Sequence, residues 1–295
     1  MVIRYEYPGS ISEAVELLTH ANGKALILAG GTDLLPELRS GELSPDCLVD
    51  ITRISELHTI DVQPESITVG AAVTFSELIR DPFLKDQVPI LVQASASVGA
   101  GGIQQSATWA GNIVQAMPAG DGIIAALALE AEVKLISSKG EIWVPVKNLF
   151  QGPGISIVNS SRELVASIRF PLHPEASAWG TAWRRIGRRS ALVLPILNCG
   201  VKMVLQNKAG TLSIKKAILA LGPVSAQPFR AKNTEAWLIG KPPEKEVFLQ
   251  AGELAREEAK PRSSILRASK EYRQVIIPIL VRDALQESLL VSQRK

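Results

Sequence analysis

The sequence predicts an α+β protein of two domains, and three features predict it. Short apolar runs typical of buried strands, such as 25–29 and 164–170, alternate with helical patterns over the first part of the chain. A connection rich in small and turn-forming residues follows at 172–180. Strand and helix patterns then resume to the end of the chain. We therefore expect a boundary near residue 175, with one α+β domain at 1–175 and a second at 176–295.

Two capping boxes mark helix starts in the first domain. Ser10 and Glu13 have the spacing at which each residue can hydrogen-bond the backbone N–H of the other, and Thr74 and Glu77 repeat it. Each pair precedes an apolar stripe with helical periodicity. The second helix should end before Pro82, because proline lacks the N–H that a helix interior needs.

The other expected elements come from shorter patterns. Those of the first domain are strands at 48–51, 67–70 and 133–136 and helices at 90–98 and 123–131. The second domain should contain strands at 201–206 and 214–221, separated by turn residues, and helices at about 246–259 and 271–290. Pro278 lies inside the last of these and should kink or split it.

Composition excludes several classes of function. The formal net charge is only +3, and the one tight basic cluster is a group of four arginines, Arg184, Arg185, Arg188 and Arg189, so we expect no nucleic-acid binding. The two cysteines, Cys47 and Cys199, are too few for an iron–sulfur cluster, which normally takes four, and we expect them to be small buried thiols. Neither a signal peptide nor a membrane span is evident, so a cytoplasmic location is expected.

The first motif with chemical potential is a glycine turn directly after a strand. It comprises Ala29, Gly30, Gly31, Thr32, Asp33 and Leu34. Glycines allow backbone amides to approach a ligand closely, and consecutive amides that point into one concavity can bind a phosphate. A tight strand-to-helix turn without a ligand would explain the same residues. The spacing is not the dinucleotide fingerprint of a Rossmann domain.

A second turn of small residues contains Thr108, Ala110, Gly111 and Asn112, and Asp121 follows it. Asn and Asp side chains are suited to anchoring a loop or a hydroxyl-rich ligand. They also often bind only their own backbone, which is the plainer explanation of this segment alone. Two such turns within one domain, however, suit a dinucleotide with an extended pyrophosphate.

With both turns in place, the sequence closely resembles the flavin subunits of molybdenum hydroxylases such as carbon monoxide dehydrogenase, nicotinate dehydrogenase and xanthine dehydrogenase. The resemblance covers nearly the whole chain. It includes the segments AGGTDLLPELRSG, TVGAAVTFSELI, SVGAGGIQQSATWAGNIVQAMPAGDG, ELVASIRFP and WRRIGRRSALVLP, in that order.

This resemblance implies a vanillyl-alcohol-oxidase-type FAD-binding domain of two subdomains, about 1–55 and 56–175, followed by a smaller α+β C-terminal domain. It also implies which residues contact FAD. The first turn, Ala29, Gly30, Gly31, Thr32, Asp33 and Leu34, would wrap the cofactor from one side, and Thr108, Ala110, Gly111 and Asn112 from the other. Asp121, Leu164, Val165 and Arg184 match further family positions near the cofactor.

The same resemblance implies a division of labour between subunits. In the family a large subunit holds the molybdenum cofactor, a small one holds two [2Fe–2S] clusters, and the flavin subunit passes electrons to an external acceptor. We therefore expect a hetero-oligomer and an electron-transfer role for this chain. No catalytic acid–base pair and no metal site are expected on it, because the redox chemistry belongs to the flavin.

The second turn departs from the family pattern of Ile-Arg-Asn followed, two residues later, by Thr-Ile-Gly-Gly-Asn. Gln104 and Gln105 replace the Arg and Asn, Trp109 replaces an aliphatic residue, and Ala110 replaces the first glycine of the pair. A methyl group would be costly there if the backbone needed positive φ, and Trp109 could reshape the wall of the pocket. Two alternatives therefore stay open: a stand-alone flavin oxidoreductase of related fold, and a scaffold subunit that has lost FAD.

Overall fold

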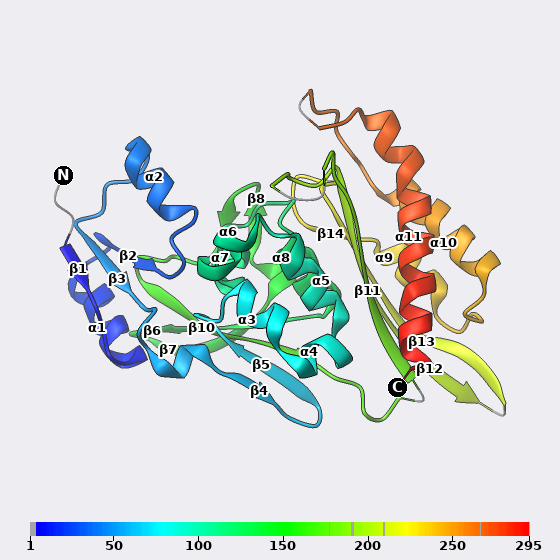
Figure 1. Ribbon diagram of the computed structural model, residues 1–295, viewed down its shortest axis with the longest axis horizontal. Coiled ribbons are helices and arrows are strands. Elements are labelled where there is room, and N and C mark those ends of the chain that lie inside the picture. The colour runs from blue at the N-terminus through cyan, green and yellow to red at the C-terminus, as the bar shows by residue number, and fades with distance from the viewer. Residues whose placement is uncertain (1–3, 177, 190–191, 209, 266, 295) are drawn as a thin grey trace.

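The computed structural model describes residues 4–176, 178–189, 192–208, 210–265 and 267–294. Figure 1 shows an elongated molecule in which the sheets follow one another along the long axis, with the N-terminal elements at one end and the last two helices at the other. The described residues form three larger sheets and a two-stranded ribbon, together with helices. The α+β prediction is confirmed.

The N-terminal sheet is small and parallel, with strand order β1-β3-β2. Its elements are β1 (Arg4–Glu6), α1 (Ile11–His20), β2 (Ala25–Leu28), α2 (Leu34–Ser40) and β3 (Cys47–Asp50), followed by the 3-10 helix η1 (Ser55–His58). Ser10 caps α1 as predicted, because its side chain accepts the amide of Glu13. The glycine turn connects the end of β2 to α2 and so lies at the carboxyl edge of this sheet.

The second sheet is antiparallel, with order β4-β5-β10-β6-β7. Its strands are β4 (Ile60–Val62), β5 (Ser66–Gly70), β6 (Glu132–Ser137), β7 (Gly140–Pro145) and β10 (Glu163–Pro171). Between β5 and β6 the chain forms α3 (Phe75–Arg80), α4 (Pro82–Gln87), α5 (Pro89–Ser97), α6 (Gly101–Ser106), α7 (Trp109–Val114) and α8 (Asp121–Ala128). Between β7 and β10 come η2 (Val146–Asn148), β8 (Phe150–Gly152) and β9 (Ile155–Ser156).

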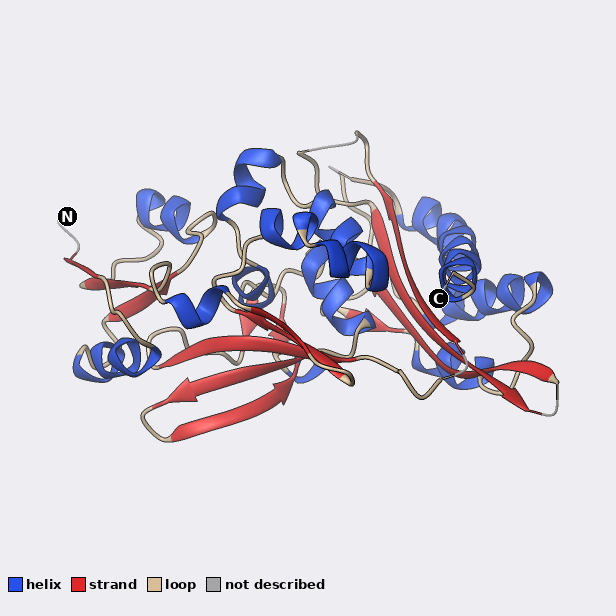
Figure 2. Cartoon of the chain, turned by 60° about the horizontal axis from the view of Figure 1, so that its bottom comes forward, coloured by secondary structure: helices blue, strands red, loops and turns tan. Residues whose placement is uncertain are grey.

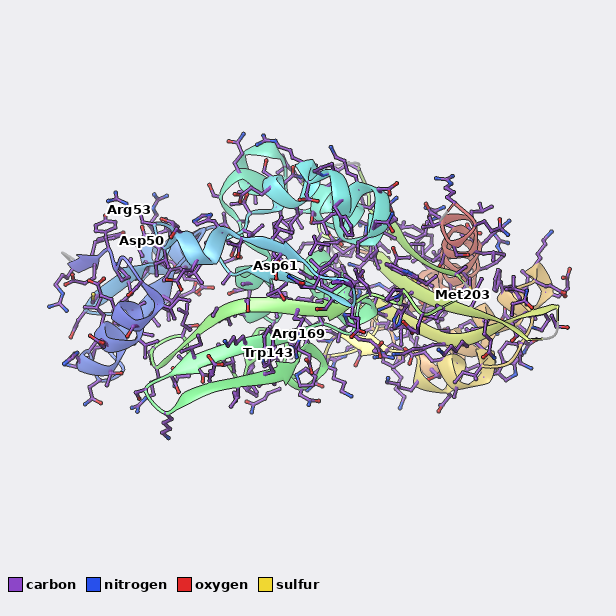
Figure 3. All side chains as sticks on the ribbon, turned by 90° about the horizontal axis from the view of Figure 1, so that it is seen from below. Asp50, Arg53, Asp61, Trp143, Arg169 and Met203 are labelled. Atoms are coloured by element: carbon purple, nitrogen blue, oxygen red, sulfur yellow. The ribbon has the colours of Figure 1, made fainter. Side chains whose placement is uncertain are left out.

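Two predictions for this region are confirmed in detail. Thr74 and Glu77 form both hydrogen bonds of a capping box at the start of α3, and α4 begins at Pro82 after α3 has ended. Strand β7 was not predicted. The guanidinium of Arg169, on β10, reaches across β6 and lies 4.1 Å from the ring centre of Trp143 on β7. Figure 3 shows these two side chains together.

The C-terminal part is a four-stranded antiparallel sheet, in the order β11-β12-β13-β14, with helices on one face. Its elements are β11 (Ala178–Ile186), β12 (Leu197–Lys208), β13 (Thr211–Gly222), β14 (Phe229–Arg230), α9 (Lys232–Leu238), α10 (Lys245–Glu258) and α11 (Lys270–Ser292). The connection from β10 to β11 contains residue 175, where we place the domain boundary.

Pro278 does not split the last helix, so that alternative is wrong. Helix α11 runs unbroken through it. Gly252 of α10 packs directly on this point, since a Cβ atom there would lie 2.5 Å from the carbonyl oxygen of Pro278 and 2.9 Å from its Cα. Packing of α10 against α11 therefore stabilises α11 at Pro278, where a proline disfavours a continuous helix.

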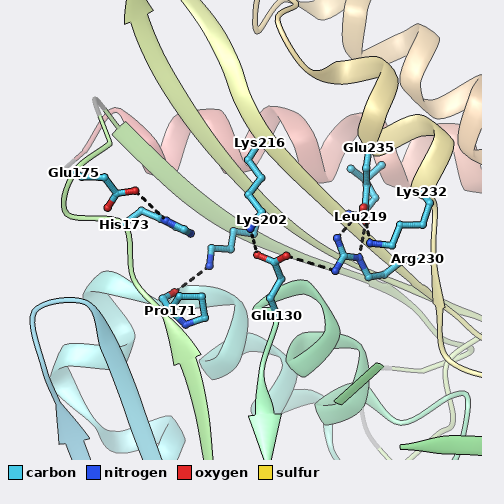
Figure 4. Close-up of polar contacts among 10 residues, drawn as sticks. All are labelled: Glu130, Pro171, His173, Glu175, Lys202, Lys216, Leu219, Arg230, Lys232 and Glu235. Atoms are coloured by element: carbon cyan, nitrogen blue, oxygen red, sulfur yellow. Dashed lines mark hydrogen bonds and ion pairs between the residues drawn. The ribbon is translucent and has the colours of Figure 1, made fainter. Parts of the chain in front are cut away.

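The C-terminal sheet is covered on both faces, as Figure 2 shows. Helices α5 and α8 contact it from the first domain, and α11 packs on the other side. Ion pairs reinforce this joint (Figure 4): the Glu130 carboxylate, just after α8, pairs with Lys216 of β13 and with Arg230 of β14. Lys202 of β12, which is fully buried, donates to the carbonyl oxygen of Pro171 at 3.0 Å.

Candidate functional site

A cavity of about 490 Å³ lies where the two predicted turns meet. Twelve of the predicted site residues line it, from three separate segments: Ala29, Gly30, Gly31, Thr32, Asp33 and Leu34; Thr108, Ala110, Gly111 and Asn112; and Leu164 and Val165. The turns contribute one wall each, and the start of β10 contributes a third. The structure therefore brings together segments that the sequence singled out separately.

Gly30 is the point at which the two turns touch. A Cβ atom on Gly30 would lie 2.7 Å from the carbonyl carbon of Ser106 and 2.8 Å from the Cα of Ala107, and closer still to the carbonyl oxygen of Ser106. Any side chain here would push backbone against backbone. The next residue, Gly31, has φ +67°, a conformation that other residues adopt only with strain. Both glycines are therefore required by the geometry of the cavity.

Hydrogen bonds fix the second turn in place. Thr108 caps α7, and its hydroxyl oxygen accepts the amide of Gly111 at 3.0 Å. The amide of Phe75 donates to the carbonyl oxygen of Ala107 at 3.0 Å, which ties the turn to the start of α3. The Gln115 side chain, at the end of α7, donates to the Glu37 carboxylate at 3.1 Å and so links α7 to α2.

The substituted positions of the second turn fit the fold. Trp109 is 0% exposed and does not line the cavity, so the expectation that it reshapes the wall is wrong. Its indole N–H donates to the carbonyl oxygen of Gly122 at 2.9 Å, and its ring packs edge-on against Phe170. Ala110 lies within α7 and is not among the residues with positive φ, so its methyl group causes no backbone strain. Gln104 donates to the carbonyl oxygens of Ala96 and Val98.

The chemistry of the lining suits a flavin nucleotide. Much of the wall is aliphatic or aromatic, and the carboxylates of Asp33, Glu37 and Glu163 could accept hydrogen bonds from sugar hydroxyls. No Lys or Arg is among the described residues that line it, so a diphosphate would be held mainly by backbone N–H groups. The Asn112 side-chain oxygen is buried without a hydrogen-bond partner and lies against Gly122 at the start of α8, where an added Cβ atom would be 2.6 Å from it.

Burial raises the pKa of the Asp33 carboxyl, and the nearby charge of Glu37 raises it further, while a weaker hydrogen bond from the Thr32 hydroxyl opposes both. An acidic wall favours neutral donors, such as hydroxyl groups, as the partners of these side chains. The phosphates would then contact the glycine turn and not the carboxylates.

Two predicted residues, Asp121 and Arg184, are not among those that line the cavity. Asp121 is 6% exposed, and its carboxylate accepts hydrogen bonds from Asn198 at 2.7 Å and from Arg185 at 3.2 Å. Burial raises its pKa to about 6, although Arg185 and Asn198 favour the charged form. Arg184 pairs with Glu287 of α11. In the structure Asp121 thus joins the two domains, and Arg184 ties β11 to α11.

The cavity also includes side chains that the sequence did not single out. Phe75, Val98, Ile103 and Glu163 are among them, together with Glu37. Each lies inside or beside a segment that carries the family resemblance, so proximity to those segments was the available signal. Their inward direction depends on how the turns and β10 pack, which no local pattern indicates.

Cys47 and Cys199 are both buried free thiols, and burial raises the pKa of Cys199 to about 12. No cluster of His, Cys, Asp or Glu suited to a metal ion occurs within the described ranges. Among the same residues, none of the helices has both the length and the apolar character needed to cross a bilayer.

Comparison with known protein families matches both parts of the chain. Residues 1–173 match the family described as "FAD binding domain in molybdopterin dehydrogenase", and residues 182–288 match the "CO dehydrogenase flavoprotein C-terminal domain". The cavity described above lies within the first of these matches.

Individual relatives agree over almost their full length. The chain is 29% identical to the putative xanthine dehydrogenase FAD-binding subunit of Escherichia coli (strain K12) over 293 residues, which cover 99% of this chain and 97% of that protein. It is 28% identical to the carbon monoxide dehydrogenase medium chain of Hydrogenophaga pseudoflava, covering 96% of each. A solved structure of carbon monoxide dehydrogenase from Hydrogenophaga pseudoflava superposes with a TM-score of 0.88 at 28% identity, covering 99% of this chain and 100% of that one.

Proposed function

Because this chain belongs to the family of FAD-binding domains in molybdopterin dehydrogenases, we propose that it carries FAD as the electron-transfer subunit of a molybdenum hydroxylase complex. One observation supports the proposal above all: two glycine-bearing turns, far apart in the sequence, meet at Gly30 around a cavity of about 490 Å³. That volume is within the range of cofactor pockets.

Each wall of the cavity has a separate task in this proposal. The backbone amides of the first turn, Ala29 to Leu34, would hold the diphosphate. Thr108, Ala110, Gly111 and Asn112 would hold the cofactor from the opposite side. Leu164 and Val165, at the start of β10, would border the cofactor from a third segment. Bound FAD would supply the redox chemistry, since a flavin can exchange electrons singly or in pairs. The protein binds, orients and shields it.

The other components of the reaction belong to partner subunits. We propose a small subunit with [2Fe–2S] clusters as electron donor, a large subunit with the molybdenum cofactor as the site of substrate hydroxylation, and an external acceptor that receives the electrons. The two buried cysteines of this chain are consistent with this division, because they cannot ligate a cluster. The assembly would be a cytoplasmic hetero-oligomer.

The proposal is tested by recording the visible spectrum and flavin content of the chain, first alone and then with its partner subunits. We expect bound FAD that the hydroxylase substrate reduces only when the cluster and molybdenum subunits are present. Reduction of the isolated chain by a substrate would instead indicate a stand-alone oxidoreductase. Absence of flavin under both conditions would indicate a scaffold.

A matched pair of glycine variants tests the assignment of the first turn. Gly31→Val should abolish flavin retention, because Gly31 has φ +67° and its Cβ would lie 3.0 Å from the side chains of both Leu28 and Leu35. Gly41→Val is the control: Gly41 has φ +80°, but a Cβ there meets nothing within 4 Å, and it does not line the cavity. Equal flavin content in the two variants would refute the assignment, because their backbone strain is similar.

A further inference from the structure

A second pocket, of about 220 Å³, lies between the two domains and shares no lining residue with the FAD cavity. The first domain contributes the segment from Met117 to Ala119 and Pro153. The C-terminal domain contributes Pro223, Ser225 and Ala226 from the connection between β13 and β14. The remaining described residues of the lining are three arginines, Arg262, Arg267 and Arg273. The walls are thus uncharged except for three guanidinium groups.

Arg273 is the buried member of this group. It is 4% exposed, in the first turns of α11, and one guanidinium nitrogen donates to the carbonyl oxygen of Pro223 at 2.9 Å. Its Nε atom is buried and has no hydrogen-bond partner. An unsatisfied buried donor on a charged group is costly unless something binds to it. Burial lowers the pKa of Arg273, and the neighbouring charge of Arg267 lowers it further.

No acid balances these charges. Among the described residues, none of the three arginines forms an ion pair with a carboxylate, and no Asp or Glu lines the pocket. Glu271 lies in the same first turn of α11, but its side chain is exposed and outside the lining. Arg188 adds a fourth guanidinium nearby by donating to the backbone carbonyl oxygen of Arg267 at 3.3 Å.

Two other arginines, Arg184 and Arg185, differ from the three that line the pocket in having acidic partners. Arg184 and Arg185, from the basic cluster that the sequence shows, are each paired with an acid, Glu287 and Asp121 respectively. The fold therefore supplies counter-ions where arginines hold elements together. At the second pocket the fold instead brings three positively charged guanidinium groups into one concavity, without a counter-ion among the described lining residues. Such an arrangement repels itself unless an anion lies among the charges.

We propose that this pocket is a binding site for a phosphoryl group, with Arg273 as the buried anchor and with Arg262 and Arg267 closing over the ligand. Guanidinium groups present paired N–H donors that match phosphate oxygens. Three of them suit a doubly charged, tetrahedral anion better than a carboxylate, which has one charge and two oxygens. The pocket holds several times the volume of one water molecule, roughly 30 Å³, and so has room for a phosphate that carries a substituent.

Titration calorimetry of the full chain with inorganic phosphate at low ionic strength tests the proposal directly. We expect saturable binding that weakens as salt is added, because the interaction is electrostatic. The Arg262→Gln and Arg267→Gln variants should each bind phosphate about tenfold more weakly, or worse, as expected for the loss of one charge-assisted contact. Arg282→Gln is the control for the loss of an arginine charge from the C-terminal domain, since Arg282 lies on α11, as Arg273 does, but pairs with Asp283 and does not line the pocket.

Arg273 requires a more conservative change, because its bond to Pro223 also supports the fold. Arg273→Lys keeps the charge but removes the paired donors, so phosphate affinity should fall by about tenfold while thermal unfolding and flavin content stay close to the parent values. Flavin content is measured for every variant. Because the two sites share no residue, loss of phosphate binding with normal flavin content separates this proposal from the proposed function.

Competition identifies the source of the phosphoryl group. Displacement of phosphate by NAD⁺ or pyrophosphate would identify a larger phosphorylated ligand, and lack of displacement would identify free phosphate; either result supports the site. Absence of phosphate binding, or equal affinity in the parent, Arg262→Gln and Arg267→Gln, would overturn it. Variants that release a partner subunit while phosphate affinity is unchanged would also overturn it, because the arginines would then contact a protein acid.

Discussion

Substitution of Gly30 by alanine is the sharpest test of the way in which this chain builds its cavity. The added methyl carbon would lie 2.7 Å from the carbonyl carbon of Ser106 and 2.8 Å from the Cα of Ala107. Carbon atoms in van der Waals contact lie about 3.5–4.0 Å apart, so the two turns must separate by roughly 1 Å. Neither neighbour is the mobile end of a side chain. Backbone must move against backbone.

The cost follows from this displacement. Overpacking of a well-packed site typically costs about 1–3 kcal/mol, and a shift of about 1 Å would also move the amides to which we assign cofactor binding. With 1.4 kcal/mol for each factor of ten, we expect FAD affinity to fall by about tenfold to one-hundredfold. Thermal unfolding of the FAD-loaded protein should also occur at a lower temperature, because weaker binding stabilises the folded state less.

Gly102→Ala provides the comparison. Gly102 lies in α6, four residues before Ser106, and a Cβ atom there meets nothing within 4 Å. Alanine favours a helix by up to about 1 kcal/mol over glycine, so this variant should be as stable as the parent or slightly more stable. Fluorescence titration with FAD and thermal unfolding with and without FAD measure both effects. If Gly30→Ala and Gly102→Ala retain flavin equally, the two turns do not meet as described.

Three further outcomes follow from buried groups. Trp109→Phe should lower the free energy of unfolding by about 1–3 kcal/mol, because the Gly122 carbonyl oxygen loses its donor. Flavin content should not change. A loss of flavin without destabilisation would contradict this prediction. Burial raises the pKa of the Asp121 carboxyl from the ordinary value of 3.8 to about 6, so its contribution to stability falls as the pH rises through this window. Denaturant unfolding of the parent relative to Asp121→Asn should show a decrease of roughly 2 kcal/mol from pH 4 to pH 7, and a flat difference would refute the assignment. Burial tends to raise the pKa of Glu130, but Lys216 and other cations lower it overall. Glu130→Gln should therefore destabilise the protein by about 2 kcal/mol at neutral pH, and the difference should fade as the pH falls below the ordinary pKa of 4.5. An effect that persists in acid would exclude the ion pairs as its cause.

Local chemistry made much of the fold predictable. The capping box at Thr74 forms in full, and Ser10 caps its helix as predicted, although the Glu13 carboxylate accepts the amide of Gly9 and not that of Ser10. The stop at Pro82 occurs where proline removes a helix donor. The glycine turn after the first buried strand was also visible, because Gly30 and Gly31 interrupt an apolar run abruptly. Patterns of this kind depend on a few neighbouring residues, so a single sequence carries them.

What the sequence did not predict depends on contacts between distant residues. Asp121 meets Arg185 and Asn198, which lie 64 and 77 residues further along the chain, so its role in joining the domains has no local signature. The sequence alone placed it only beside the second turn. Trp109 likewise turns into the core because Gly122 and Phe170 provide its partners. The family resemblance located the segments that line the cavity. Which side chains of each segment point toward the cavity depends on packing, which the sequence did not show.

The substituted second turn shows how those distant contacts preserve the cavity. Loss of a glycine at Ala110 costs little because α7 already holds that residue in a helical conformation, and Thr108 satisfies the amide of Gly111. Trp109 also links α7 to α8, because its indole N–H donates to the carbonyl oxygen of Gly122. The turn is thus anchored by its core side, while Ala110, Gly111 and Asn112 still line the cavity. A bulky residue in this turn is therefore compatible with flavin binding, because it stabilises the wall from outside the space that the cofactor needs.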